Sequence, residues 1–245
     1  MTPSSPDMPR KPQVAWVTGA AGGIGRATVA QLAAAGWAVE GADLAPTRLT
    51  GVHACRKLDV TDEQAVKGEA ARLADSYGGL DAVIHLAGET GLGPLKAVTV
   101  AEWHRLLEVN LTSAFLVARS SLELLEARQG RLVLMASING LNGGSSLSGP
   151  AYAVAKAGVI NLARYLAREW AAQGIRVYCL APGPVDTPML QRLDATVRER
   201  LTRASPLHRI TTAEEVAAVI LGLLGPAGSA LTGTVHNISQ GMELD

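Results

Sequence analysis

A glycine-rich turn near the start of the chain constrains the fold more than any other feature of the sequence. Residues 14–18 form an apolar run with the length of a buried strand, and residues 23–35 have the pattern of a helix. The glycines between them allow the backbone to turn tightly and to approach a bound group closely. Because a helix N-terminus attracts negative charge, we expect a dinucleotide pyrophosphate to bind here. The residues expected at the pyrophosphate are Gly19, Gly23, Ile24 and Gly25.

Short apolar runs alternate with longer amphipathic runs along the rest of the chain. This alternation predicts an α/β fold, a Rossmann-like doubly wound, mostly parallel seven-stranded sheet with helices on both faces. The predicted strands are residues 14–18, 37–42, 52–58, 80–86, 131–136, 175–180 and 234–238, and the main helices are 23–35, 63–77, 101–127, 151–173 and 214–224. No boundary interrupts the alternation, so we expect one domain over residues 12–245. Residues 1–11 read as a flexible lead-in.

Tyr152 and Lys156 lie about 130 residues downstream of the glycine-rich turn, in a predicted helix. Residues four apart on a helix share a face, so this tyrosine and lysine can handle a proton as one unit. The turn is expected to bind a cofactor, and the tyrosine–lysine pair is expected to act as an acid or base. Together they indicate a nicotinamide-dependent oxidoreductase.

These motifs resemble those of the short-chain dehydrogenase/reductase family, in its single-domain branch of about 250 residues. Thr18-Gly19-x-x-x-Gly23-x-Gly25 matches the cofactor turn of that family, and Tyr152-x-x-x-Lys156 matches its active-site motif. The resemblance runs over residues 13–242 and implies interconversion of a secondary alcohol and a ketone by hydride transfer. It places the four catalytic residues at Asn110, Ser137, Tyr152 and Lys156.

Asp43 is expected to select the cofactor. It ends the second predicted strand, where a carboxylate can accept hydrogen bonds from the ribose hydroxyls of adenosine. Two like charges about 4 Å apart repel by roughly 4 kcal/mol at an effective dielectric constant near 20, so Asp43 disfavours a 2′-phosphate. Ala20, Ala21 and Gly22 offer no basic side chain to hold that phosphate, which also favours NAD(H). Arg48 is the nearby base that could reverse this preference.

The resemblance implies the remaining cofactor contacts. Asp59 and Val60 should flank the adenine, and Ala87 and Gly88 should line the cofactor after the fourth strand. The segment that holds the nicotinamide carboxamide should comprise Pro182, Gly183, Val185 and Thr187, and Tyr152 and Lys156 should also contact the cofactor.

The chemistry requires removal or delivery of a hydroxyl proton as hydride moves. A free tyrosine titrates near pH 10, and the positive charges of Lys156 and an oxidised nicotinamide favour its phenolate. Ser137 can donate a hydrogen bond to the substrate oxygen. By resemblance, Lys156 also binds the nicotinamide ribose and Asn110 holds a water that links the lysine to solvent.

The sequence departs from the family at two places. The family commonly has two asparagines before Ala87, where this chain has His85 and Leu86, and we interpret His85 as a structural substitute. Gln240 stands where the family commonly has paired glycines, which leaves the contribution of the C-terminus open. A homotetramer or homodimer is expected by analogy.

Composition excludes several other classes of function. The 22 basic and 22 acidic residues balance, so we expect no nucleic-acid or membrane partner. Cys55 and Cys179 are expected to be unpaired, and the histidines lack metal-ligand spacing, so no catalytic metal is expected. No signal peptide or apolar segment of about 18 residues is evident, which favours a cytoplasmic location.

Three stretches that follow strand ends, residues 89–100, 138–149 and 183–210, should form the substrate pocket, with the third as a lid. The first two carry little charge, so a neutral ketone or alcohol is favoured. Among the basic residues of the third, Arg192, Arg203 and Arg209 are the candidates to bind a carboxylate or phosphate on a substrate.

Three alternatives remain. A 3-oxoacyl carrier-protein reductase would use NADPH and a basic surface for its acidic partner. A nucleotide-binding protein without catalysis would bind cofactor but turn over no substrate. A carbohydrate epimerase or dehydratase is disfavoured by the short C-terminal part.

Overall fold

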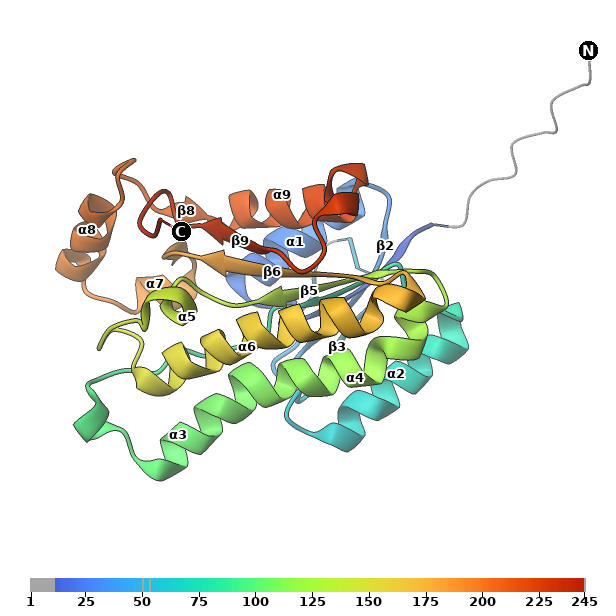
Figure 1. The fold of residues 1–245 in the computed structure, drawn as a ribbon, viewed down its shortest axis with the longest axis horizontal. Helices are drawn as coiled ribbons and strands as arrows, with labels where there is room; N and C mark the ends of the chain where they lie inside the picture. Colours follow the sequence, from blue (N-terminus) through green and yellow to red (C-terminus); the bar gives the residue numbers. More distant parts are fainter. Residues whose placement is uncertain (1–11, 50, 53, 245) are drawn as a thin grey trace, which may run out of the picture.

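The computed structural model describes residues 12–49, 51–52 and 54–244, and its centre is a sheet of seven strands (Figure 1). All neighbouring strands pair in parallel. This confirms the predicted fold class. The expected lead-in, residues 1–11, lies outside the described residues. In spatial order the strands are β3 (Ala54–Lys57), β2 (Ala38–Asp43), β1 (Val14–Thr18), β4 (Ala82–His85), β5 (Arg131–Met135), β6 (Arg176–Pro182) and β9 (Val235–Ile238).

Helices cover both faces of the sheet, as Figure 1 shows. One apolar cluster joins alternate strand residues to α2 (Glu63–Tyr77), α4 (Ser113–Glu126) and α6 (Pro150–Glu169). A second cluster joins the other strand residues to α1 (Gly23–Ala34) and α9 (Ala213–Leu224). Because both faces of the central strands β1, β4 and β5 are buried, these strands are apolar at nearly every position, which explains their continuous apolar runs in the sequence.

The helix predicted over residues 101–127 is interrupted. The structure has α3 (Val100–Leu107), a π-helical segment η2 (Glu108–Thr112) and then α4. A π-segment adds one residue to a helical turn, so the helical pattern continues on both sides. The predicted helix over residues 63–77 is confirmed as α2, with Asp62 accepting hydrogen bonds from two backbone N–H groups at its N-terminus.

The three stretches predicted to form the pocket lie beyond the carboxyl ends of the strands. The first contains η1 (Leu95–Ala97) and the second contains α5 (Asn139–Asn142). They meet where the Gly93 N–H donates to the Ser146 carbonyl at 2.7 Å. The third contains β7 (Val185–Asp186), α7 (Pro188–Gln191) and α8 (Ala195–Ala204), and β7 pairs with β8 (Thr211–Thr212). Short helices η3 (Trp170–Gln173) and η4 (Pro226–Ala230) complete the described elements.

The strand order reverses between β1 and β4, because β2 and β3 lie to one side of β1 and the later strands to the other. Crevices at such a point, outside the carboxyl ends of the strands, are where open α/β sheets bind ligands. The glycine-rich turn follows β1 and the Ala87-Gly88 pair follows β4, so both lie at this point. Within the described ranges, no helix is long and apolar enough to cross a membrane.

Candidate active site

The turn between β1 and α1 has a backbone that only glycine fits at its critical positions. Gly19 has a φ of +69°, and a Cβ there would lie 2.6 Å from the backbone nitrogen of Ala87. A Cβ on Gly25 would overlap the carbonyl oxygen of Gly19. The turn is therefore packed directly against the segment that follows β4, which brings two of the predicted cofactor segments together.

The N-terminus of α1 fits a pyrophosphate. Gly22 occupies the N-cap without a side chain to bond the first N–H groups, and the first turn contains no acidic residue. Unbonded N–H groups at a helix N-terminus favour an anion. When bound, a nicotinamide dinucleotide supplies the hydride donor or acceptor, and these residues would hold its phosphates.

Asp43 lies at the end of β2 with its carboxylate directed at the turn. Its Oδ2 accepts from the Ala21 N–H at 2.9 Å, and its Oδ1 accepts from the Ala45 N–H at 3.0 Å. Arg26 also folds back onto this turn, donating to the Ala21 carbonyl at 2.8 Å and to the Thr47 hydroxyl at 2.7 Å. A carboxylate and a guanidinium thus flank the same backbone.

The other predicted cofactor residues lie at the same edge of the sheet. Asp59 follows β3 and accepts from the N–H and the hydroxyl of Thr61 at 2.9 and 2.7 Å, and the adjacent Val60 is buried. Thr187 lies so close to the glycine turn that a Cβ on Gly23 would be 2.6 Å from its Cγ2. Pro182, Gly183 and Val185 connect β6 to β7 on the way to this threonine.

Ser137, Tyr152 and Lys156 come from two adjoining elements. Ser137 follows β5 and is buried, and its Oγ accepts from the Asn139 N–H at 3.2 Å. Tyr152 and Lys156 lie on α6, with the Lys156 Nζ 5.5 Å from the centroid of the tyrosine ring. Burial raises the pKa of the Tyr152 phenol, and the Ser137 hydroxyl opposes that rise. The protein alone therefore keeps Tyr152 protonated.

Lys156 is buried, and its ammonium group donates to the Met135 carbonyl at 2.8 Å. Burial lowers the pKa of Lys156 to about 8, with a small opposing effect from the Cys179 thiol. Gly88 lets this ammonium group approach, because a Cβ on Gly88 would be 3.3 Å from Nζ.

Asn110 lies in the π-helical segment η2 and is fully buried. Its side-chain nitrogen donates to the carbonyls of Glu89 and Leu106 at 2.8 and 2.9 Å, and its oxygen accepts from the Glu89 N–H at 3.2 Å. A Cβ on Gly88 would lie 2.8 Å from that oxygen. Asn110 therefore fixes the backbone of residues 88–89 beside Lys156.

His85 is buried between the end of β1 and the start of α4, and its ring forms two hydrogen bonds. Its Nδ1 lies 2.7 Å from the Thr18 Oγ1 and its Nε2 lies 3.0 Å from the Ser113 Oγ. Burial lowers the pKa of His85 to about 3, with a further contribution from the charge of Lys156. This environment agrees with the interpretation of His85 as a structural residue.

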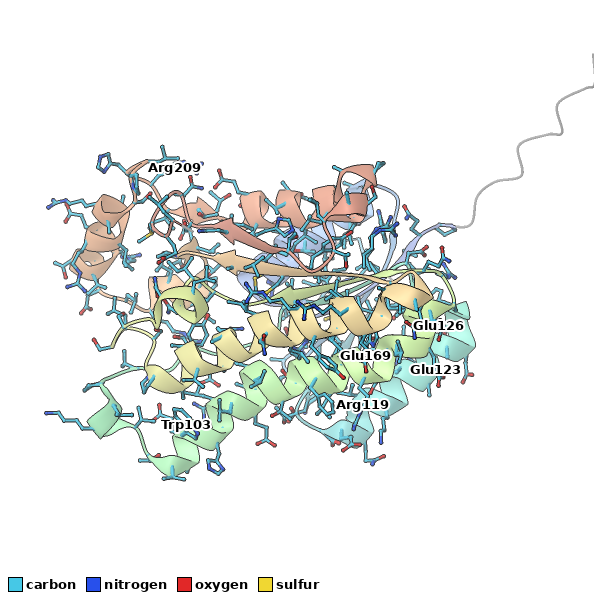
Figure 2. All side chains as sticks on the ribbon, in the orientation of Figure 1. Trp103, Arg119, Glu123, Glu126, Glu169 and Arg209 are labelled. Atoms are coloured by element: carbon cyan, nitrogen blue, oxygen red, sulfur yellow. The ribbon has the colours of Figure 1, made fainter. Side chains whose placement is uncertain are left out.

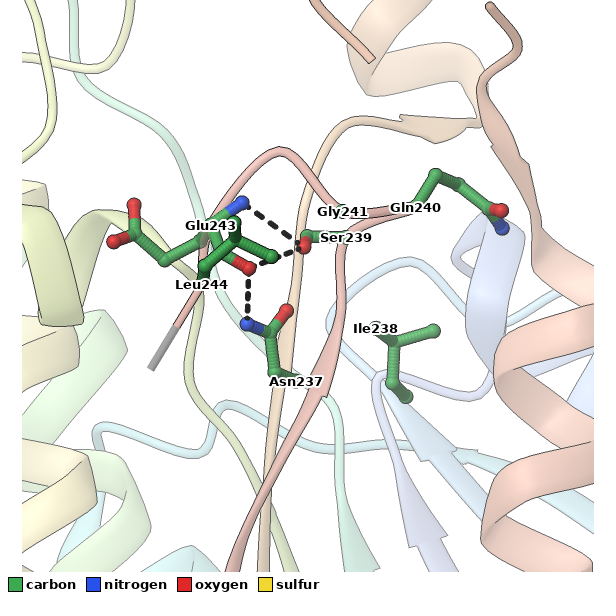
Figure 3. Close-up of a pocket in the computed structure, with 7 residues that line it drawn as sticks. All are labelled: Asn237, Ile238, Ser239, Gln240, Gly241, Glu243 and Leu244. Carbon is green, nitrogen blue, oxygen red and sulfur yellow. Dashed lines mark hydrogen bonds between the residues drawn. The ribbon is translucent and has the colours of Figure 1, made fainter. Parts of the chain in front are cut away.

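The C-terminal segment lines an open cavity of about 490 Å³ at this edge (Figure 3). Its Ser239 packs on Gly183, where a Cβ would be 3.1 Å from the Ser239 Cα. Glu243 accepts from the Asn142 side chain at 2.5 Å, which ties the segment to α5. Gln240 has a φ of +57° and donates to the Thr211 hydroxyl at 3.2 Å. The C-terminal segment thus contacts both the predicted nicotinamide segment and the loop after Ser137.

Comparisons with known proteins agree with this geometry. A family model described as enoyl-(acyl carrier protein) reductase matches residues 19–243. The chain is 38% identical to cis-4-hydroxycyclohexanecarboxylate dehydrogenase of Sinomonas cyclohexanicum, over 94% of this chain and 96% of that relative. The chain belongs to the short-chain dehydrogenase/reductase family. It is an oxidoreductase that acts on CH–OH groups with a nicotinamide cofactor.

Other members of this family are similar over nearly their whole length. The 3-oxoacyl-(acyl-carrier-protein) reductase FabG of Thermotoga maritima is 32% identical, over 94% of this chain and 97% of the relative. The crystal structure of levodione reductase superposes with a TM-score of 0.86 at 30% identity, covering 94% of this chain and 96% of that one.

Two features of this short-chain dehydrogenase/reductase were missed from the sequence. Arg26 stands one helical turn after Gly22, a position from which a side chain can reach back to the turn, whereas Arg48, the base expected near the cofactor, is exposed. The contact between Asn142 and Glu243 joins residues far apart in sequence and has no periodic signal.

Proposed function

We propose that this protein is an NAD(H)-dependent oxidoreductase that interconverts a small neutral ketone and its secondary alcohol, with Tyr152 as the general acid and base. The observation that carries the proposal is the grouping of Ser137, Tyr152 and Lys156 at the carboxyl end of β5, beside the glycine-rich turn. A carbonyl oxygen placed between the hydroxyls of Ser137 and Tyr152 could accept a hydrogen bond from each.

In the reducing direction, the carbonyl carbon receives hydride while Tyr152 transfers its hydroxyl proton to the oxygen. Ser137 stabilises the charge that develops on that oxygen by donating a hydrogen bond. The positive charge of Lys156 favours the phenolate that results. Asn110 keeps the backbone of residues 88–89 in place beside the lysine.

The preference for NAD(H) is supported by Asp43. Its carboxylate is held at the turn by two backbone N–H groups, so it cannot easily move away from a 2′-phosphate. Arg26 opposes this preference, because it lies against the same turn. Its guanidinium is engaged with the Ala21 carbonyl and the Thr47 hydroxyl.

A neutral substrate is supported by the charges around the pocket. Of the three candidate arginines of the third stretch, Arg203 pairs with Glu199 at 2.5 Å and Arg209 pairs with Glu215 at 2.8 Å. Glu243 adds a negative charge at the cavity. The names of a hydroxycyclohexanecarboxylate dehydrogenase and of levodione reductase among the similar proteins suggest a ring ketone.

The test is a fluorescence titration with NADH and NADPH, followed by assays of cyclohexanone, 4-oxocyclohexanecarboxylate and a linear ketone with the tighter cofactor. Tighter binding of NADH and faster reduction of the neutral ketones than of the carboxylate support the proposal. Faster reduction of the carboxylate would contradict the neutral-substrate assignment.

A second candidate is a 3-oxoacyl carrier-protein reductase that uses NADPH. The position of Arg26 against the cofactor turn and the similarity to FabG favour it. It predicts tighter NADPH binding and reduction of acetoacetyl thioesters in the same assays. Cofactor binding without turnover of any substrate would instead indicate a nucleotide-binding protein without catalysis.

We also propose a homotetramer, with a homodimer as the smaller possibility. Phe115 on α4 and Val154 and Tyr165 on α6 are exposed apolar or aromatic side chains on the outer surface of these helices. Figure 2 shows that Arg119 of α4 and Glu169 of α6 lie on the same side of the molecule. Light scattering after size-exclusion chromatography measures the oligomeric state directly.

A further inference from the structure

We propose that His85 is a positioning residue that holds Thr18, at the start of the cofactor turn, with one ring nitrogen and Ser113, which follows the π-helical segment of Asn110, with the other. His85 stands where the family commonly has an asparagine. The role of the site that His85 would position rests on the proposed function. His85 itself is assigned no contact with substrate or cofactor.

The register of the sheet places His85 opposite Thr18. The two residues are paired in the parallel β1–β4 ladder, and alternate residues of a strand point to the same face. Val83 and Trp16, two positions earlier on each strand, face the α2, α4 and α6 layer. The side chain of His85 therefore points toward α4, where Ser113 begins the helix.

The hydrogen bonds have a defined direction. The Ser113 hydroxyl donates to the Val109 carbonyl at 2.7 Å, so its oxygen accepts from the His85 Nε2–H at 3.0 Å. The Nδ1 of the same neutral ring then accepts from the Thr18 hydroxyl at 2.7 Å. Thr18, His85 and Ser113 are each buried, so loss of any member leaves a polar atom unpaired.

Each end of this chain of hydrogen bonds reaches a part of the active site. Thr18 immediately precedes Gly19, and its carbonyl accepts from the Leu86 N–H at 3.1 Å, which closes the contact between the turn and the segment after β4. Val109 immediately precedes Asn110 within η2. His85 thus connects the cofactor turn to the residue that fixes the backbone beside Lys156.

Two substitutions separate the halves of the proposal. An asparagine places its amide near the position of Nδ1, so His85→Asn can keep the bond to Thr18 but is too short for Ser113. A glutamine places its amide near Nε2, so His85→Gln can keep the bond to Ser113 but not the one to Thr18. We expect His85→Gln to raise the NADH dissociation constant about tenfold and His85→Asn to leave it within about twofold.

The hydrogen bond between His85 and Ser113 can be tested by a measurement that needs no turnover, namely hydrogen exchange. In His85→Asn we expect hydrogen exchange of the amides in residues 108–113 to accelerate about tenfold, with kcat at saturating NADH lowered by a similar factor. His85→Gln should retain the wild-type exchange rate and kcat. Thr18→Val should reproduce the binding defect of the glutamine variant, and Ser113→Ala should reproduce the exchange defect of the asparagine variant.

Tyr178→Phe is the matched control. It removes another buried hydrogen bond, from the Tyr178 hydroxyl to the Gly228 carbonyl at 2.8 Å, in a region distant in sequence from the turn and η2. It should lower the melting temperature without changing NADH binding, kcat or exchange in residues 108–113.

Equal effects of His85→Asn and His85→Gln on both NADH binding and exchange would overturn the proposal, as would wild-type values in both variants. Its failure is distinguishable from failure of the proposed function. If the wild-type protein binds NADH but reduces no ketone, the proposed function fails, whereas binding and hydrogen exchange still test both halves of the His85 assignment.

Discussion

The Lys156 ammonium group donates to the Met135 carbonyl at 2.8 Å, two residues before Ser137 on the chain. This contact joins α6, which carries Tyr152 and Lys156, to the end of β5. It also means that a buried positive charge is held by a neutral acceptor in the protein without cofactor. The cost of that burial is visible in the lowered pKa of Lys156, about 8.

The first prediction concerns stability in alkali. The pKa of Lys156 is about 8 in the folded protein and 10.5 ordinarily, so between these values the unfolded chain binds more protons. The free energy of unfolding contributed by Lys156 therefore rises with pH across this window, by about 2 kcal/mol from pH 7.5 to pH 9.5. Urea titrations at both pH values give the change in the free energy of unfolding for the wild type and for Lys156→Met, and the difference between these two changes is the contribution of Lys156. An identical pH dependence in both would contradict the prediction.

The second prediction concerns stability in acid, where burial of His85 should lower the free energy of unfolding as the pH falls. The pKa of His85 is about 3 in the folded protein against an ordinary 6.5, so the unfolded chain takes up a proton first as the pH falls below 6.5. Between pH 7 and pH 5 the wild-type protein should lose about 2 kcal/mol more stability than His85→Gln, which cannot be protonated. Denaturant unfolding at the two pH values tests this. The loss should be the same in both proteins if the folded chain accommodates a charged His85.

Gly19→Ala should weaken cofactor binding through a backbone clash. Gly19 has a φ of +69° and no room for a Cβ beside Ala87, whereas Gly36 has a φ of +82° with no atom within 4 Å. Both alanine variants should lose about 1 kcal/mol of stability from the left-handed backbone. Only Gly19→Ala should weaken NADH binding by more than about tenfold. Equal NADH affinities in the two variants would show that the turn tolerates a side chain.

Asp43→Asn tests the basis of cofactor selection. Removing the charge should raise the affinity for NADPH relative to NADH by at least about tenfold, since repulsion of roughly 4 kcal/mol before relaxation is lost. Fluorescence titration with both cofactors measures the ratio. Arg26→Gln, made in the Asp43→Asn background, should lower NADPH affinity again. An unchanged ratio in the single variant would mean that Asp43 does not select the cofactor.

The sheet and much of the candidate site were predictable because they depend on local patterns. The glycine-rich turn and the spacing of Tyr152 and Lys156 are fixed by a strand, a turn and a helix. The interruption at residues 108–112 was not predictable, because a single added residue leaves the apolar pattern on both sides intact. The contact between Asn142 and Glu243 was not predictable either, because it joins residues far apart in sequence that only the tertiary fold brings together.

The most direct test of the account is deuterium transfer to cyclohexanone from NADH that carries deuterium at both C4 positions, followed by mass spectrometry of the alcohol. The wild-type protein should place deuterium on the carbinol carbon. Tyr152→Phe should bind NADH as tightly as wild type but form the labelled alcohol at least about a hundredfold more slowly. Transfer at a near-normal rate in Tyr152→Phe would remove Tyr152 from the mechanism and contradict the account.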